Sequence, residues 1–292
     1  VTINGLNVQG GEKTVDEDDL LPNGSDPSKE PTTVSGTFSV VAPDGLNNLT
    51  VGGINVVVGG VASVPQSTTT PLGNTLTITG FSSGVVSYSY TLLSNETHPN
   101  ANGENLLSES FAVNASDTDG DVATTAYLDI NIVDDIPSAT NEPAQSVAEG
   151  ATKLGSFDFV PRADGAGVSH INGASLSFGG DSYSQLIDVG HGVIKVKADG
   201  SYSYTADAAV NNTNPVTDNL TFTVTDGDGD VVTKSASFTI TDVNVPTGGI
   251  TNAAVDDDGL TGGNPASTDG DLVVTPDSDA HETTFSGTLN FG

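Results

Sequence analysis

Two segments of the chain follow one pattern: a strand with alternating apolar residues, a turn made of Asp and Gly, and a second alternating strand. The later turn is Asp226–Asp230 (DGDGD), between the strands TFTVT and VVTKSASFTIT. The earlier turn is Asp117–Asp121 (DTDGD). Alternation is typical of strands that bury one face, and Asp-Gly pairs close tight hairpins. The pattern therefore predicts the same β-hairpin at the same place in two repeats.

Other segments repeat as well, which indicates a tandem organisation. The matched segments are SYSYT at 87–91 and 201–205, GTF to DG at 36–45 and GSF to DG at 155–165, and VDEDDL at 15–20 and VDDDGL at 255–260.

The matches divide the chain into repeats. Residues 14–136 and 137–245 are each predicted to form one complete β-sandwich repeat. Residues 1–13 align with the end of the later hairpin, so we expect them to be the last strand and linker of a preceding repeat. Residues 246–292 are expected to be the truncated start of a further repeat. A chain with these parts is most simply a fragment of a long array.

Short strands at a spacing of about 8–12 residues, with turn signals between them, predict an all-β fold. We expect tandem immunoglobulin-like or cadherin-like antiparallel β-sandwiches of about 100 residues each, with very little helix. In the second repeat the expected strands are Ser156–Val160, Ala174–Phe178, Ser184–Asp188, Gly192–Val196, Ser201–Tyr204, Asn219–Thr225 and Val231–Ile240. Alternation places both tyrosines of each SYSYT segment on one strand face, which favours core packing over a sugar-binding platform.

The charge of the chain excludes several partners. Among 292 residues there are 7 Lys and Arg against 38 Asp and Glu, a formal net charge of −31. Nucleic acid and anionic membrane surfaces both require a basic face, so neither is expected as a partner. The chain has no Cys, so disulfides cannot hold the fold together. No apolar run approaches the ~20 residues of a membrane-spanning helix.

The acidic turns are candidate calcium sites. Three carboxylates within five residues repel one another unless a cation lies among them, and calcium takes six to eight oxygen ligands. Acids also gather where one repeat should meet the next, so we predict calcium both at the turns and at the junctions. The alternative is a set of solvated acids that only keep the chain soluble. The candidate ligands are Asp117, Asp119, Asp121, Asp226, Asp228 and Asp230 in the turns, and Asp16, Asp18, Asp134, Asp135, Glu149, Asp242, Asp256 and Asp258 at the junctions.

The segment DGSYSYT at 199–205, followed by FTVTDGDGD at 222–230, resembles the VCBS and related cadherin-like repeats of giant type I-secreted bacterial adhesins. These are adhesins of the repeat-in-toxin and biofilm-forming kinds. The resemblance covers both complete repeats, although the first has GVVSYSYT at 84–91 instead of DGSYSYT. It implies a secreted, extracellular or cell-surface spacer, rigidified by calcium, that gives reach and stiffness in adhesion, filament or biofilm formation.

Catalysis is not expected. The four histidines, His98, His170, His191 and His281, are scattered and fit no metal-ligand or triad spacing. Two hypotheses for the function therefore remain: a structural spacer, or a module that binds a glycan or protein through the loop Leu92–Glu109. That loop has no aromatic residue and no Arg, which favours the spacer. Its expected partners are the neighbouring repeats of the same chain and, as an alternative, other copies in a fibre.

Overall fold

The computed structural model describes residues 1–26, 32–98, 103–210 and 214–243. Residues 1–241 form one unit, which contains two β-sandwiches, each around its own hydrophobic core. Asp256, Asp258, His281 and the whole of the expected further repeat at 246–292 lie outside the described residues. The tandem immunoglobulin-like sandwich fold is confirmed for the described part of the chain, where a three-residue 3-10 helix, η1 (Glu17–Asp19), is the one helical element.

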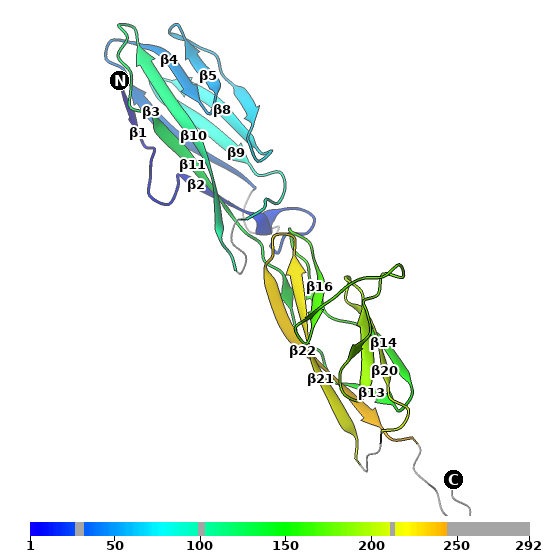
Figure 1. Cartoon of the computed structure of the whole chain (residues 1–292). Helices are drawn as coiled ribbons and strands as arrows, with labels where there is room; N and C mark the ends of the chain where they lie inside the picture. Colours follow the sequence, from blue (N-terminus) through cyan, green and yellow to red (C-terminus); the bar gives the residue numbers. More distant parts are fainter. Residues whose placement is uncertain (27–31, 99–102, 211–213, 244–292) are drawn as a thin grey trace, which may run out of the picture. The chain divides into compact units, whose positions relative to one another are not determined.

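The first sandwich consists of two sheets (Figure 1). One sheet has the strand order β1 (Thr2–Asn4), β3 (Thr33–Val41), β9 (Val85–Thr91), β8 (Thr75–Ser82) and β7 (Gln66–Thr69). The other has the order β2 (Lys13–Asp16), β11 (Ala126–Val133), β10 (Leu106–Asp117), β4 (Leu46–Val51), β5 (Ile54–Val58) and β6 (Val61–Ala62).

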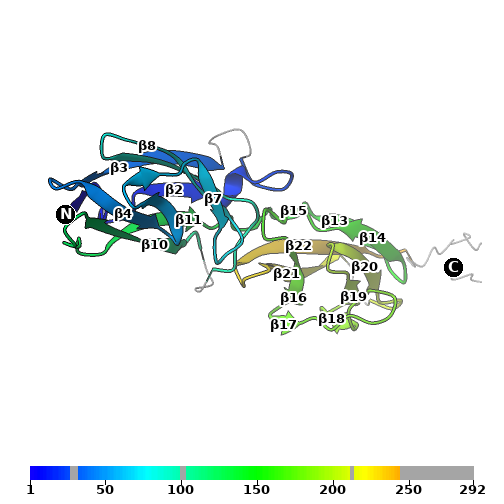
Figure 2. The ribbon, with the colours of Figure 1, turned by 90° about the horizontal axis from the view of Figure 1, so that it is seen from above.

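The second sandwich also has two main sheets, which Figure 2 shows with most of their strands labelled. One has the order β13 (Gln145–Ala148), β22 (Val231–Thr241), β21 (Val216–Asp226), β16 (Ala166–Ile171) and β17 (Ala174–Ser175). The other has β14 (Thr152–Ser156), β20 (Ser201–Ala206), β19 (Gly192–Val196) and β18 (Ile187–Asp188). A separate pair joins β12 (Ser138–Ala139) and β15 (Phe159–Val160).

Each sandwich contains one parallel strand pair in addition to the expected antiparallel pairs. β2 runs parallel to β11, with Val15 opposite Ile132. β13 runs parallel to β22, with Val147 opposite Ile240. The first and last long strands of a sandwich therefore lie side by side and point the same way. The residues that follow the two strands therefore lie at the same end of the sheet.

The tyrosines of the SYSYT segments pack in the cores, as predicted. Tyr90 and Tyr204 are fully buried, and their hydroxyl groups have equivalent partners. The Tyr90 hydroxyl donates to Glu109 Oε2 at 2.6 Å, and the Tyr204 hydroxyl donates to Asp218 Oδ2 at 2.7 Å. Both acids are buried. A buried hydroxyl requires such a partner, so each sandwich fixes its core tyrosine in the same way.

The other tyrosine of each pair covers a glycine on the neighbouring strand. Gly36 faces Tyr88 across β3 and β9, and Gly155 faces Tyr202 across β14 and β20. A Cβ atom at either glycine would overlap the tyrosine hydroxyl. The repeated Gly at this position is therefore explained by the space that the ring occupies.

Two sequence expectations differ from the structure. Residues 1–13 were expected to close a preceding repeat, but β1 pairs with β3, with Thr2 opposite Val41. This segment thus completes a sheet of the first sandwich. In the second sandwich β13 and β16 were not predicted, and the strands expected at Ala174–Phe178 and Ser184–Asp188 are only two residues long. A register shift between Val168 and His170 in β16 breaks the alternation by which strands are recognised.

Candidate metal site

The acidic turns have the same internal construction in both sandwiches. Asp226 Oδ1 accepts the backbone N–H of Gly229 at 3.0 Å and of Asp230 at 2.7 Å. Asp117 Oδ1 accepts the N–H of Gly120 at 3.2 Å and of Asp121 at 2.8 Å. The glycine in each turn has a φ above 100°, which a residue with a Cβ rarely adopts. The first Asp of the motif therefore builds the turn, and the later carboxylates are held at its surface.

In the second sandwich this turn meets residues of the first. Oxygens of Asp134, Asp228 and Asp230 lie within 4.8 Å of one another. Asp134 directly follows β11, whereas the other two belong to the β21–β22 turn. A second group with the same spacing joins Asp134 to Glu17 of η1 and His98. Asp134 therefore belongs to both groups, and the two together define a junction cluster.

Glu17 is in the junction cluster because of the parallel pairing of β2 with β11. Val133 lies opposite Asp16 at the end of this pair, so Asp134 and Glu17, the next residue on each strand, come out at the same edge. Asp16 itself caps η1, with its Oδ1 accepting the N–H of Asp18 at 3.1 Å. The two predicted ligands Asp16 and Asp18 thus flank Glu17, which the sequence interpretation did not select.

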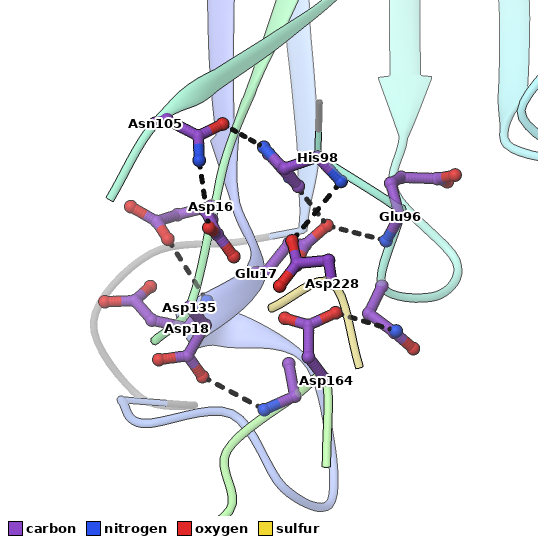
Figure 3. Close-up of polar contacts among 12 residues, drawn as sticks. Asp16, Glu17, Asp18, Glu96, His98, Asn105, Asp135, Asp164 and Asp228 are labelled. Carbon is purple, nitrogen blue, oxygen red and sulfur yellow. Dashed lines mark hydrogen bonds and ion pairs between the residues drawn. The ribbon is translucent and has the colours of Figure 1, made fainter. Parts of the chain in front are cut away.

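The loop that follows β9 binds the second sandwich directly (Figure 3). Asn95 Nδ2 donates to Asp164 Oδ1 at 2.9 Å. The backbone N–H of His98 donates to Asp228 Oδ2 at 3.3 Å. The N–H of Gly103 donates to Asp230 Oδ1. Three residues of this loop therefore donate hydrogen bonds to carboxylates of the second sandwich.

His98 lies between Asn105 and Glu17 in the close-up (Figure 3). Its Nδ1 is 2.9 Å from Asn105 Oδ1, and its Nε2 is 3.4 Å from Glu17 Oε1. The N–H of Glu96 also donates to Glu17 Oε1, at 2.8 Å. In the described part of the chain, His98 is the one basic side chain within ion-pair distance of the junction carboxylates.

Asp135 contributes to the junction in a different way. Its Oδ2 accepts the N–H of Ser25 at 2.9 Å and the N–H of Ala163 at 3.3 Å. These amides belong to the first and the second sandwich, respectively. The buried Asp135 carboxylate thus joins the two sandwiches through hydrogen bonds to the backbone.

Several buried carboxylate oxygens at the junction have no hydrogen-bond partner among the described residues. They are Glu17 Oε2, Asp134 Oδ1, Asp164 Oδ2, Asp226 Oδ2, Asp228 Oδ1 and Asp230 Oδ2. Burial of an unpartnered anionic oxygen is costly, and a cation bound among these residues would lower that cost. Hard oxygen ligands in this number fit calcium.

Raised pKa values also indicate that negative charge is concentrated at the junction. Burial, together with Asp230 and Asp228, raises the pKa of Asp134 to about 8. Burial and the neighbouring Asp228 raise the pKa of Asp226 to about 7. Burial also raises the pKa of Glu17. For His98 burial acts in the opposite direction, but the contacts with Glu17 and Asn105 outweigh it and raise the pKa. A divalent cation would favour the charged form of these carboxylates.

The other predicted ligands lie apart from the junction. Asp117 and Asp119 form a group with Asp44 at the corresponding turn of the first sandwich. Asp119 and Asp44 are exposed there, and the exposed Asp121 contributes its backbone N–H to the turn.

Glu149 lies next to the end of β22, where its N–H donates to Thr241 O at 3.2 Å. The exposed Asp242 follows directly. By the parallel register, Glu149 and Asp242 correspond to Glu17 and Asp134 of the first sandwich.

Sequence reasoning missed Glu17, Asp44, His98 and Asp164. For three of them a signal existed. Asp44 and Asp164 occupy equivalent Asp-Gly pairs in the matched segments, and Glu17 corresponds to Glu149 when Val15 is aligned with Val147. His98 has no counterpart in the other repeat, so no comparison within the sequence could have found it.

Comparisons with known proteins agree with the fold. The family profile described as "Bacterial Ig domain" matches residues 134–241, which is the second sandwich together with the acids that precede it. No curated protein matches the chain. The described part of the chain contains no helix long and apolar enough to cross a membrane.

Solved structures match this chain at low identity and low TM-score. The D00-D0 domain of intimin is 13% identical, with a TM-score of 0.26, and the match covers 72% of this chain and 93% of that one. Drosophila N-cadherin EC1-4 is 14% identical, with a TM-score of 0.29 and coverage of 88% and 55%. The fibronectin(III)-like modules of Clostridium thermocellum CbhA are 7% identical, with a TM-score of 0.24 and coverage of 82% and 95%.

Proposed function

We propose that this chain is a calcium-stabilised, non-catalytic spacer of a bacterial extracellular or cell-surface protein, in which bound calcium fixes one sandwich against the next. The observation that carries the proposal is the set of buried, unpartnered carboxylate oxygens contributed by both sandwiches to one junction. A role in an adhesin or biofilm matrix follows from the sequence resemblance and belongs to the proposal in the same way.

The site has the properties that such a joint requires. Neither sandwich supplies enough ligands alone: Glu17 and Asp134 come from the first, and Asp164, Asp228 and Asp230 come from the second. A cation bound by both groups adds a contact that exists only when the sandwiches are joined. Its binding free energy then stabilises the junction by mass action.

The second sandwich carries a matching pair at its other end. Glu149 and Asp242 stand at the positions of Glu17 and Asp134, and Glu149 Oε1 is also buried without a hydrogen-bond partner among the described residues. A module with one set of acids at its entry and another at its exit is suited to repetition, which supports a spacer.

The alternative of a ligand-binding module is disfavoured by the loop on which it depends. Asn95 and His98 of that loop bond to Asp164 and Asp228 of the second sandwich. A loop held in this way has its polar groups directed to the junction. We therefore do not propose it as a binding surface for a glycan or protein.

The calcium concentration around the chain determines whether the junction is filled. Extracellular calcium modules typically have a Kd of about 10⁻⁴–10⁻³ M, so they fill outside a cell and stay empty in the cytosol. The chain would be loosely joined before export and stiff afterwards.

Thermal unfolding of the full chain in calcium and in chelator tests this proposal, with calorimetric titration giving the number of ions. At a calcium concentration 100 times Kd we expect about 2.7 kcal/mol of stabilisation, or a rise in Tm of about 5–10 °C. Magnesium at the same concentration is the control and should have a much smaller effect, because it dehydrates reluctantly. Identical melting curves in calcium and chelator, without heat of binding, would refute the proposal.

A further inference from the structure

The geometry points to a second cation site at the junction, formed by Glu17, His98 and Asp134, that takes a transition-metal ion of the zinc type. It is separate from the oxygen-only group of Asp134, Asp228 and Asp230, with which it shares Asp134. Glu17 and Asp134 also belong to the proposed calcium joint, and His98 is the ligand that distinguishes the second site.

The spacing of the ligand atoms fits a small ion. One ligand atom from each of Glu17, His98 and Asp134 lies within 4.8 Å of the other two. His98 Nε2 is 3.4 Å from Glu17 Oε1, which is longer than the 2.7–2.9 Å of a charge-assisted hydrogen bond. Two ligands of a tetrahedral ion with bonds of about 2.1 Å are about 3.4 Å apart. The Glu17–His98 spacing is thus long for a charge-assisted hydrogen bond and suitable for two ligands of one metal ion.

The tautomer of His98 leaves the correct nitrogen available. Nδ1 lies 2.9 Å from Asn105 Oδ1, an acceptor, so Nδ1 donates its proton there. Nε2 is then the nitrogen directed at Glu17, and a bound metal ion would take the place of its proton. The amide of Asn105 also donates from Nδ2 to Asp134 Oδ2 at 3.3 Å. Metal-binding histidines are usually oriented by such a bond from their other nitrogen. Here one residue, Asn105, orients two of the three ligands (Figure 3 shows His98 and Asn105).

Burial supplies an independent reason for a ligand. The exposed fractions of Glu17, His98 and Asp134 are 0%, 3% and 1%. Glu17 Oε2 and Asp134 Oδ1 are buried and have no hydrogen-bond partner among the described residues. Three protein ligands leave a fourth position, as in other zinc sites that keep one open.

The histidine sets the class of ion. Imidazole nitrogen favours zinc, copper and nickel, whereas calcium prefers oxygen alone. The corresponding loop of the second repeat, DAAVNNTNP at 207–215, contains no His. The other acidic group, Asp44 with Asp117 and Asp119, contains none either. Among the described residues, this junction is therefore the one place where a histidine joins such an acidic group.

The test is zinc titration of the tag-free full chain in saturating calcium, with zinc-edge anomalous diffraction to locate the ion. We expect one zinc bound at His98. His98→Gln should weaken zinc binding about tenfold or more and leave the calcium-induced rise in Tm in place. His170→Gln is the matched control, since His170 contacts only Ser169 and Ser175 in the described hydrogen bonds, and it should leave zinc binding unchanged.

A zinc affinity that His98→Gln does not change, or an anomalous peak away from the Glu17 and Asp134 carboxylates, would overturn the inference. Should His98→Gln not fold, Asn105→Ala serves in its place and is expected to weaken zinc binding by releasing the imidazole. Zinc binding without any calcium effect would refute the calcium proposal and leave this one standing. A calcium effect without zinc binding would do the reverse.

Discussion

The turns Asp117–Asp121 and Asp226–Asp230 share a motif and a backbone, yet their surroundings differ. In the first sandwich Asp119 and Asp121 are exposed, and Asp44 is their one acidic neighbour in the described clusters. In the second, Asp230 is buried and Asp228 is half-buried, because Glu17, Asp134 and the loop after β9 cover them.

Under the proposed function, this difference makes the acidic turn half of a site. The motif alone provides a preformed turn with carboxylates at its surface, which water can solvate. The exit of another sandwich, with an acid after each of two parallel strands, removes that water and adds the remaining ligands. Metal affinity is therefore expected to depend on the junction more than on the motif.

The largest expected difference between the two turns is the loss of calcium stabilisation when two aspartates of one turn are replaced by asparagine. Asp228→Asn with Asp230→Asn removes two charged oxygens from the junction, and we expect it to abolish most of the calcium stabilisation, about 2.7 kcal/mol at 100 times Kd. The matched pair Asp119→Asn with Asp121→Asn should leave this stabilisation largely intact. Unfolding followed by calorimetry in calcium and in chelator measures both. An equal loss in the two double variants would mean that the motif, and not the junction, binds the ion.

A second experiment concerns the glycine–tyrosine contact that both sandwiches contain. Gly36→Ala and Gly155→Ala each place a Cβ against a tyrosine hydroxyl, and each should cost about 1–3 kcal/mol. Chemical denaturation should give the same cost in calcium and in chelator, since neither glycine is near the junction cluster. Tyr202→Phe removes the hydroxyl and should restore part of the stability lost in Gly155→Ala. A cost that appears only in calcium would contradict this separation of core and junction.

The smallest effect is the pH dependence of the calcium-free protein. The pKa values of Asp134 and Asp226 are raised in the folded state to about 8 and about 7, so the folded state binds more protons than the unfolded state above about pH 4. Their contribution to stability is complete below that pH and is lost as the pH rises to about 8. His98, whose pKa is also raised, acts in the same direction.

We therefore expect the free energy of unfolding in chelator to fall between pH 5 and pH 8 by an amount on the order of 1 kcal/mol, which a lower Tm would reveal. Calcium should remove this fall, because the ion binds the charged carboxylates. Asp134→Asn should flatten the profile in chelator, whereas Asp119→Asn, at the exposed turn, should not. A Tm in chelator that rises over this range would contradict the assignment.

Much of the fold could be predicted from local pattern. Alternation located the hairpin of β21 and β22, placed Tyr90 and Tyr204 in the cores, and matched β19 at Gly192–Val196. Strands that break the pattern were missed, such as β16 with its register shift at His170. The parallel pairing of β13 with β22 joins segments about 90 residues apart and leaves no local signal.

The site was less accessible to prediction for the same reason. Asp228 and Asp230 stand out because three acids alternate with glycines. Glu17 and His98 can be recognised as site residues only once the fold brings β2, β11 and the loop after β9 together, because the two residues then lie next to Asp134. A buried position for His98 cannot be inferred from its neighbours in the sequence, which are Thr97 and Pro99.

The parallel pairs have a consequence for a chain under tension. The chain passes through β13 near the start of the second sandwich and leaves through β22, and four residue pairs join these strands in parallel register. A pull on the two ends drives the strands in opposite directions along their common axis. The hydrogen bonds of the ladder are then loaded together in shear, instead of being peeled apart one by one. The pairing of β2 with β11 gives the first sandwich a ladder of the same kind, after β1, which pairs with β3.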